Sequence, residues 1–278
     1  YEGVDIKGEG SLGLITYMRT DSTRIAQEAQ DMARSIIKAR FGEKYLPKTP
    51  RTYKTKKDAQ DAHEAIRPTY IEKDPESLKD SLSKDQYKLY KLIYDRFLAS
   101  QMESAIYDYL SSELEVDEYI FRLTGSRLKF AGYMDVYVEG KDNDEEEDEN
   151  QLPDIKENDV LKPVDLDKKQ HFTQPPPRYT EATLIKALEE KGIGRPSTYA
   201  PTIQTILERG YVYKEDRYLK PTEIGIVVTN ILKDYFKDII DIEFTAELEE
   251  NLDMVEEGKA DWVEIVRKFY NPLEKELE

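Results

Sequence analysis

The sequence predicts an α+β protein of several domains, mostly helical, with a β-rich linker domain between two helical parts. Apolar residues recur at helical spacing in much of the first region, but from Ser104 to about residue 138 the period is nearer two. From Thr180 onward the order is helix, tight turn, helix, hairpin, helix, which is typical of a winged-helix-like unit. We therefore expect domains at 1–103, 104–172 and 173–278.

Length and composition limit the classes of protein to consider. The 278 residues are enough for two domains or three small ones. No apolar run approaches the roughly 20 residues that a membrane span needs, which excludes a transmembrane segment. With no cysteine and only 2 histidines, disulfides, thiolate zinc sites and a histidine-rich metal site are excluded. Because the chain begins at Tyr1, without a start methionine or signal peptide, we expect it to be part of a longer protein.

The net charge of −17 is concentrated in two stretches. Residues 139–158 carry ten acidic and two basic side chains, and residues 241–278 carry thirteen acidic and four basic ones, so the rest of the chain is neutral overall. Within that neutral part, residues 44–57 hold six basic side chains and no acidic one. An acidic protein rarely binds nucleic acid, but this local basic stretch weakens the argument. It is equally compatible with a solvated loop.

The first region is predicted to begin with a strand and a helix. Residues 11–17 are apolar and β-branched, as in a short buried strand. Thr20, Asp21 and Ser22 offer N-capping side chains for the next helix, and Gly42 would end it. The inward positions of this helix are predicted to be Ile25, Ala29, Met32 and Ile36.

Two further elements complete the first region. A short segment at 61–66 ends at Arg67-Pro68, because the residue before proline avoids the α conformation. Residues 84–103 are predicted to be helical, with an inward stripe of Leu89, Ile93 and Phe97.

The β-rich region is predicted to hold a hairpin. Apolar residues alternate over 119–123 and again over 128–130, and the Thr-Gly-Ser sequence at 124–126 supplies a turn. Residues 140–150 form an acidic run of low complexity. Because like charges repel and nothing there can be buried, we expect a disordered loop.

The third region is predicted to be helical with one hairpin. Thr180 can cap a helix at 181–190, and a second helix starts at Ser197 or Thr198 and ends before Gly210. A hairpin with its turn at Glu215-Asp216 follows, then helices at about 222–236 and 246–270. Helix-turn-helix patterns also occur in proteins that never contact DNA.

Tyr17 and Arg19 form the first candidate site. If the strand continues past Tyr17, both side chains lie on one face. A phenol is a poor nucleophile at neutral pH, but a nearby guanidinium favours the phenolate and can grip a phosphate. Attack of a phenolate on phosphorus would give a covalent phosphotyrosyl intermediate that conserves the energy of the broken ester. A helix N-terminus at residues 20–22 would add a phosphate site. A tyrosine at a strand end is also compatible with a structural role.

Three segments of the sequence together resemble one known family. GLITYMRTDST (13–23) resembles the active-site segment of type IA DNA topoisomerases, with the tyrosine as nucleophile. AQDAHEAIRPT (59–69) resembles the family segment whose histidine lies near that site, and residues 178–212 resemble the single-strand-binding segment. The segments occur in family order and together span nearly the whole chain. Met18 is typical of the bacterial topoisomerase I branch.

The resemblance implies an architecture and a reaction. It implies the gate architecture of the type IA enzymes, with the β-rich domain as a flexible arch. It implies that Tyr17 cleaves one strand of negatively supercoiled DNA and becomes joined to its 5′ end. The other strand then passes and the free 3′ hydroxyl reseals the break, without ATP. On the same resemblance Arg19 would hold the scissile phosphate, and His63 would assist near it or bind the strand.

The single-strand groove implied by the resemblance involves five more residues: Arg195, Ser197, Thr198, Arg209 and Gly210. Structural alternatives stay open at several positions. His63 could be a satisfied helix histidine, Arg195 a helix-start arginine and Gly210 an ordinary residue after a helix end. Gly210 could serve both purposes, because a backbone without Cβ lets a phosphate approach closely.

The cofactor and partners also follow from the resemblance. The family holds Mg²⁺ in an N-terminal Toprim domain, so Mg²⁺ is implied for the whole enzyme and no metal site is expected in this chain. We expect single-stranded or negatively supercoiled DNA as partner, no membrane, a monomer, a cytoplasmic nucleoid location, and weak or no relaxation by this chain alone. The alternative function is a non-catalytic single-stranded DNA-binding or helix-turn-helix module. A relaxase is disfavoured by the scarcity of histidine, and the multi-arginine pattern of tyrosine recombinases is missing.

Overall fold

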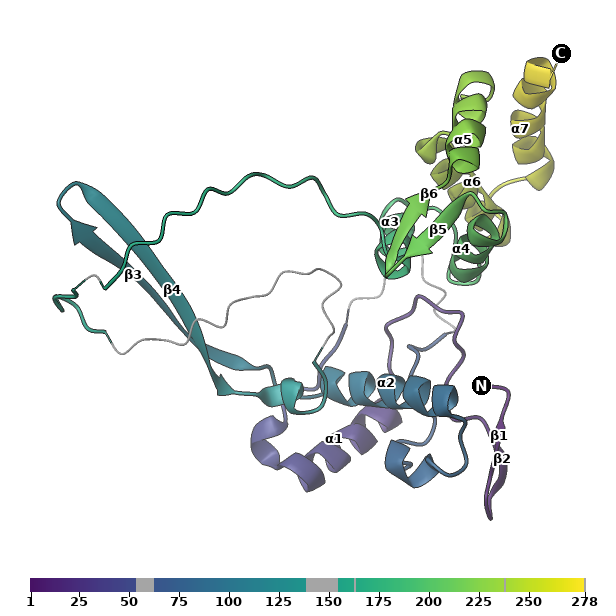
Figure 1. Cartoon of the computed structure of the whole chain (residues 1–278). Coiled ribbons are helices and arrows are strands. Elements are labelled where there is room, and N and C mark those ends of the chain that lie inside the picture. The colour runs from purple at the N-terminus through teal and green to yellow at the C-terminus, as the bar shows by residue number, and fades with distance from the viewer. Residues whose placement is uncertain (54–62, 139–154, 163, 238, 278) are drawn as a thin grey trace. The chain divides into compact units, whose positions relative to one another are not determined.

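The computed structural model describes residues 1–53, 63–138, 155–162, 164–237 and 239–277. These residues form helices and short antiparallel sheets, so the predicted α+β class is confirmed (Figure 1).

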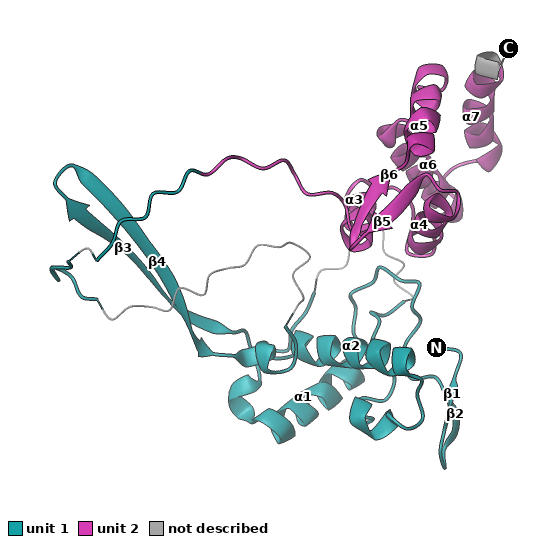
Figure 2. Cartoon of the chain, in the orientation of Figure 1, with its two compact units in different colours: residues 1–170 teal, residues 171–278 magenta. Residues whose placement is uncertain are grey.

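The chain divides into two compact units, residues 1–170 and 171–278 (Figure 2). The predicted β-rich region at 104–172 falls within the first unit except for its last two residues. The finer division into three domains stays a prediction.

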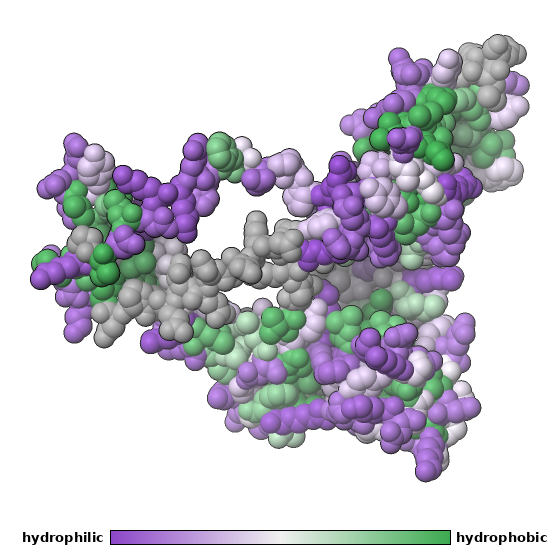
Figure 3. All heavy atoms as spheres, in the orientation of Figure 1, coloured by the Kyte–Doolittle hydropathy of each residue, from purple (hydrophilic) through white to green (hydrophobic). Residues whose placement is uncertain are grey.

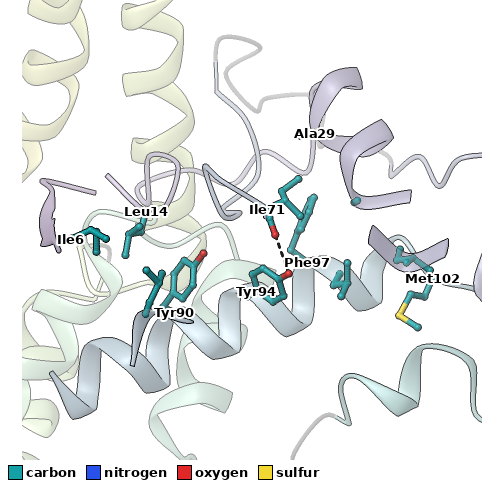
Figure 4. Packing of buried hydrophobic residues seen from close by; sticks show 12 residues of the cluster. Ile6, Leu14, Ala29, Ile71, Tyr90, Tyr94, Phe97 and Met102 are labelled. Atoms are coloured by element: carbon teal, nitrogen blue, oxygen red, sulfur yellow. Dashed lines mark hydrogen bonds between the residues drawn. The ribbon is translucent and has the colours of Figure 1, made fainter. Parts of the chain in front are cut away.

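The core of the first unit lies between two helices, α1 (Gln27–Phe41) and α2 (Lys84–Ser100). Ile37 of α1 and Leu98 of α2 are almost completely inaccessible to solvent. Figure 4 shows how the buried side chains meet around α2. The other buried members of this core are Ile6, Leu14, Ala29, Ala33, Ile71, Leu78, Tyr90, Tyr94, Phe97 and Met102.

The inward stripe predicted for α2 is wrong at its first position. Leu89 is 55% exposed, whereas Tyr90 and Tyr94 on the next face are buried. The Tyr90 hydroxyl donates to the carbonyl of Lys73 at 2.8 Å. The Tyr94 hydroxyl donates to the carbonyl of Ile71 at 2.9 Å (Figure 4). Because each ring is buried and each hydroxyl has a partner, tyrosine serves here as a core residue. A stripe predicted from aliphatic spacing does not identify such buried tyrosines.

The predicted register of α1 is wrong in the same way at one position. Met32 is exposed, and Ala33 and Ile37 are buried in its place. Gly42 ends the helix as predicted, with a φ of 95° that favours glycine.

The start of α1 also differs from the prediction. The helix begins at Gln27, and its N-cap Ala26 makes no side-chain capping bond. The hydroxyls of Thr20 and Ser22 instead accept hydrogen bonds from the N–H groups of Ser22 at 3.0 Å and Arg24 at 3.2 Å. Such bonds stabilise local turns and compete with helix capping. The expected phosphate-binding helix N-terminus at residues 20–22 is therefore wrong.

The predicted strand at 11–17 is shorter than expected. β1 (Val4–Ile6) pairs with β2 (Gly10–Leu12). Beyond β2, Ile15 forms an isolated antiparallel bridge to Pro68. The ladder does not continue there, because the N–H of Arg67 donates to the side-chain hydroxyl of Thr16 at 2.9 Å.

The β-rich region is one long antiparallel hairpin, β3 (Ile106–Val116) and β4 (Tyr119–Phe130). The predicted turn at 124–126 is wrong, because Gly125 pairs with Leu110 inside the ladder and the turn lies at Asp117 and Glu118. The apolar residues change face along β4 while the ladder continues, and that change of phase mimics a turn in the sequence. Asp117 takes a positive φ of 51°, which aspartate tolerates in tight turns.

Short 3₁₀ helices connect these elements. They are η1 (Glu43–Tyr45), η2 (Pro75–Leu78) and η3 (Gly132–Asp135). The ring of Tyr45 packs 4.9 Å from that of Phe130, measured between centroids, and its hydroxyl donates to Asp135. The base of the hairpin is thereby fixed to the helical part of the unit.

The second unit has the predicted order of helix, turn, helix, hairpin, helix. It consists of α3 (Glu181–Glu190), α4 (Tyr199–Glu208), β5 (Val212–Glu215), β6 (Tyr218–Pro221) and α5 (Glu223–Tyr235). Thr180 caps α3 as predicted, with Thr183 completing a capping box. The hairpin turn lies at Asp216 and Arg217, one residue later than predicted, and Asp216 has a positive φ of 54°.

The predicted single tail helix is two helices. α6 spans Ile242–Glu256 and α7 spans Trp262–Leu277. Gly258 separates them with a φ of 70°, a conformation that ordinary residues avoid.

The second unit leaves many apolar side chains exposed. Figure 3 shows them gathered over α5. The exposed apolar residues of α5 are Ile224, Ile226, Val227, Ile231, Leu232 and Tyr235. By contrast, the buried apolar side chains among the described residues of this unit are Ile203, Leu219 and Ile265. The first unit therefore holds most of the packed core.

Some predictions fall outside the described residues. These concern the acidic loop at 140–150 and parts of the stretches 44–57 and 61–66. Within the described ranges, no helix is both long enough and apolar enough to cross a membrane.

Candidate active site

The phenol of Tyr17 lies between two other rings. Its ring centroid is 5.1 Å from that of His63, with the planes tilted by 44°. The ring of Tyr1 also meets the Tyr17 ring edge-on, with 5.3 Å between the two centroids. Tyr17 and His63 are both half-buried. The structure thus brings together two of the three residues predicted for the first site, although they lie far apart in the sequence.

Hydrogen bonds between two segments of the chain hold these rings together. The N–H of Thr16 donates to the carbonyl of Arg67 at 3.0 Å, and the N–H of Thr69 donates to the carbonyl of Leu14 at 2.9 Å. The N–H of Ala65 donates to the carbonyl of Arg24 at 2.8 Å. The segment carrying Tyr17 is therefore clamped along the segment that follows His63.

An ion pair stiffens the segment beside His63. The guanidinium of Arg67 contacts the carboxylate of Glu64, with nitrogen-to-oxygen distances of 2.6 and 2.8 Å. Only 13% of the Arg67 side chain and 23% of the Glu64 side chain are exposed. Arg67 also donates to the carbonyl of Pro68 at 2.9 Å. A partly buried pair with two bonds is far better ordered than an exposed one.

The backbone at Arg19 does not continue the extended conformation that leads to Tyr17. Residues 18 and 19 form a bend, so the strand geometry that would place Arg19 on the face of Tyr17 does not extend to it. The side chain is exposed, and within the described part of the chain it makes no hydrogen bond or ion pair. A free guanidinium of this kind is available to an anionic ligand.

The five predicted single-strand-binding residues lie at the two ends of α4. Arg195, Ser197 and Thr198 precede its first residue, and Arg209 and Gly210 follow its last. A helix of 10 residues spans about 15 Å, so these two groups are separated by the length of α4.

The loop before α4 is tied to α6 through Arg195. Its guanidinium donates to Asp253 and lies 3.8 Å from a carboxylate oxygen of Glu249. Burial alone would lower the pKa of Arg195, but the hydrogen bond and the two negative charges outweigh it and raise that pKa. The Thr198 hydroxyl accepts from the Arg195 N–H at 2.9 Å. Arg195 is thus engaged within the chain, while Ser197 and Thr198 are exposed.

The loop after α4 is more open. Arg209 is exposed, and no atom lies within 4 Å of the place that a Cβ on Gly210 would occupy. Gly210 has a φ of 66°. The hydroxyl of Thr222 donates to its carbonyl at 2.6 Å, which fixes the turn against the start of α5. Space beside a glycine backbone next to an exposed arginine suits an approaching phosphate.

Comparison with known proteins decides the family. A family model described as DNA topoisomerase matches residues 1–267. The chain belongs to the type IA DNA topoisomerases. It is similar to the full-length topoisomerase I of Thermotoga maritima, solved in a monoclinic crystal form, with a TM-score of 0.85 and 39% sequence identity. The match covers 100% of this chain and 44% of that one, so the chain spans less than half of that topoisomerase.

The described residues of this topoisomerase chain contain no group of three or more His, Cys, Asp or Glu side chains that could hold a metal ion. The Mg²⁺ implied for a type IA enzyme stays a prediction about residues outside this chain.

Sequence reasoning missed several residues that position the candidate site. It singled out Tyr17 and His63 but not Thr16, Glu64 and Arg67, whose bonds place them. One signal was available, since an acidic residue three positions before Arg67 can pair with it on one turn. Nothing local signalled that Thr16 would bond across the chain.

Proposed function

We propose that this chain carries the nucleophile and part of the single-strand-binding surface of an ATP-independent topoisomerase that relaxes negatively supercoiled DNA. The observation that carries the proposal is the contact between Tyr17 and His63, at 5.1 Å between ring centroids, inside a segment that matches the family. We expect the enzyme to act as a monomer in the cytoplasm, with Mg²⁺ bound outside this chain.

The proposed reaction conserves the energy of the DNA backbone. The Oη of Tyr17 attacks a phosphodiester phosphorus, and the bond from phosphorus to the 3′ oxygen breaks. The phenol gives up its proton and the leaving 3′ oxygen gains one. A phosphotyrosyl bond to the 5′ end results, so the reverse attack by the 3′ hydroxyl needs no outside energy.

The surrounding residues supply orientation and charge. His63 lies against the phenol, with 5.1 Å between the ring centroids, and would limit its rotation and contact the same phosphate. The free guanidinium of Arg19 would bind a non-bridging phosphate oxygen. The open turn at Arg209 and Gly210 would hold the backbone of the single strand in the second unit.

Covalent trapping tests this function. The chain is mixed with single-stranded DNA labelled at its 3′ end, so that the label stays on the piece joined to Tyr17. Mg²⁺ is present, with or without a separately produced Toprim domain from a type IA enzyme. After denaturation we expect labelled protein that requires both Tyr17 and the added domain.

Tyr17→Phe is the control, because it removes the nucleophilic oxygen and keeps the ring. DNA binding without labelled protein in the mixture, when a full-length enzyme does give labelled protein, would favour the alternative of a non-catalytic DNA-binding module.

A further inference from the structure

Thr16 links the segments of Tyr17 and His63 through its side chain. Its hydroxyl donates to the carbonyl of Ala65 at 2.7 Å and accepts from the N–H of Arg67 at 2.9 Å. Its own N–H donates to the carbonyl of Arg67 at 3.0 Å. One residue thus makes three hydrogen bonds to the segment that begins at His63.

These bonds lie where the regular main-chain pairing between the two segments ends. Ile15 forms an isolated bridge with Pro68, and the next donor of that strand, the N–H of Arg67, bonds to the Thr16 hydroxyl in place of a main-chain carbonyl. The Thr16 hydroxyl instead satisfies one acceptor and one donor of the opposite backbone, both partly buried. Losing it would leave both groups without that partner, and a polar group shielded from water is destabilising when its hydrogen bond is lost.

These bonds lie close to both rings along the chain. Thr16 directly precedes Tyr17, and Ala65 lies two residues after His63. The Glu64–Arg67 ion pair links two residues of the receiving segment to each other. A change in either connection would move one ring against the other.

We propose that Thr16 is a positioning residue, whose hydroxyl sets the contact between Tyr17 and His63, and that Glu64 assists it by holding Arg67. The catalytic consequence rests on the proposed function, but the ring arrangement can be measured without it.

Nuclear magnetic resonance of the histidines gives a direct readout. The chain has only 2 histidines, so two sets of imidazole signals are expected, one from His63 and one from His171. The Tyr17 ring shifts the His63 signals by its ring current, and Tyr17→Leu gives their position without that ring. We expect Thr16→Val, which keeps the branched shape, to move the His63 signals toward the Tyr17→Leu position.

Two controls separate positioning from general damage. Thr16→Ser keeps the hydroxyl and should leave the His63 signals at their wild-type position, and the His171 signals should not move in any variant. A folded Thr16→Val variant with unchanged His63 signals would overturn the proposal. If that variant does not fold, Glu64→Gln must displace the His63 signals in the same direction, and unchanged signals there would equally overturn it.

Covalent trapping in the mixture with the Toprim domain tests the consequence. We expect Thr16→Val to slow strand cleavage about 10- to 100-fold at saturating DNA, with DNA affinity unchanged and with rescue by Thr16→Ser. Cleavage by Thr16→Val at the wild-type rate would overturn the catalytic part. If wild-type protein does not cleave but the His63 signals shift as expected, the positioning stands and the proposed function fails.

Discussion

The guanidinium of Arg195, in the loop before α4, is hydrogen-bonded to the carboxylate of Asp253 on α6. Glu249 adds a second carboxylate oxygen at 3.8 Å. A carboxylate presents the same paired acceptors to a guanidinium that a phosphate does. The residue predicted to bind DNA therefore already has an internal anionic partner.

Releasing Arg195 should strengthen binding to single-stranded DNA. In the double variant Glu249→Gln and Asp253→Asn the guanidinium loses its partners and becomes available to a phosphate. We expect higher affinity and a steeper salt dependence, by about 0.7 in the slope of log K against log salt for one added phosphate contact. Fluorescence anisotropy at several salt concentrations measures both quantities.

A matched control exists on the same helix. Glu247 and Glu250 are exposed, and within the described part of the chain neither forms an ion pair. Glu247→Gln with Glu250→Gln removes the same charge from α6 and should raise affinity less, with an unchanged slope. Equal effects of the two double variants would mean that Arg195 gains no phosphate contact.

Tyr17→Phe should leave the fold intact. Within the described residues the Tyr17 hydroxyl makes no hydrogen bond, so its removal leaves no partner unsatisfied there. We expect a change in unfolding free energy within about 0.5 kcal/mol, the usual range for substitutions that disturb no buried feature. Urea unfolding measures it. A loss of several kcal/mol would show that the hydroxyl is structural, and the missing labelled protein in the trapping experiment could then reflect misfolding.

The first unit should lose stability at alkaline pH through its buried tyrosines. Burial raises the pKa of Tyr90 and of Tyr94 above that of an unfolded tyrosine, which is near 10. Each ring is thus protonated in the folded state where the unfolded chain has begun to lose its proton. This stabilisation is complete below about pH 10 and is lost as the pH rises through the folded pKa values.

Urea unfolding at pH 8 and at several values above pH 10 tests this pH dependence. In the double variant Tyr90→Phe with Tyr94→Phe, the unfolding free energy should fall less steeply as the pH rises. Each substitution also removes a hydrogen bond to a backbone carbonyl. Tyr109→Phe, at an exposed position of the hairpin, serves as the control and should keep it. An identical decline in the double variant would assign it to other groups.

Hydrogen exchange should distinguish the two units. Slow exchange requires buried, well-packed elements, and α2 lies in the main core while much of α5 is exposed. We expect amides in the middle of α5 to exchange at least about tenfold faster than those around Tyr94. Mass spectrometry of peptides from each helix gives the rates. Equal protection of both helices would contradict the packing described here.

Much of the fold follows from neighbouring residues in the sequence. The Thr180 cap, the positive φ of Gly42 and Gly210 and the order of elements in the second unit all match local patterns. The predictions failed where a local pattern had two solutions. The hydroxyls of Thr20 and Ser22 stabilise a turn instead of capping a helix, and Gly125 continues a strand instead of forming a turn.

The sequence by itself determined the family segments, the class of fold and the identity of Tyr17 as the candidate nucleophile. Only the tertiary structure decided that Thr16 and Arg67 hold Tyr17 against His63, and that Arg195 pairs with Asp253. The physical reason is distance along the chain. Helices, caps and turns form from bonds between near neighbours, whereas these contacts join residues 46 to 58 positions apart, and they exist only after the intervening elements have packed.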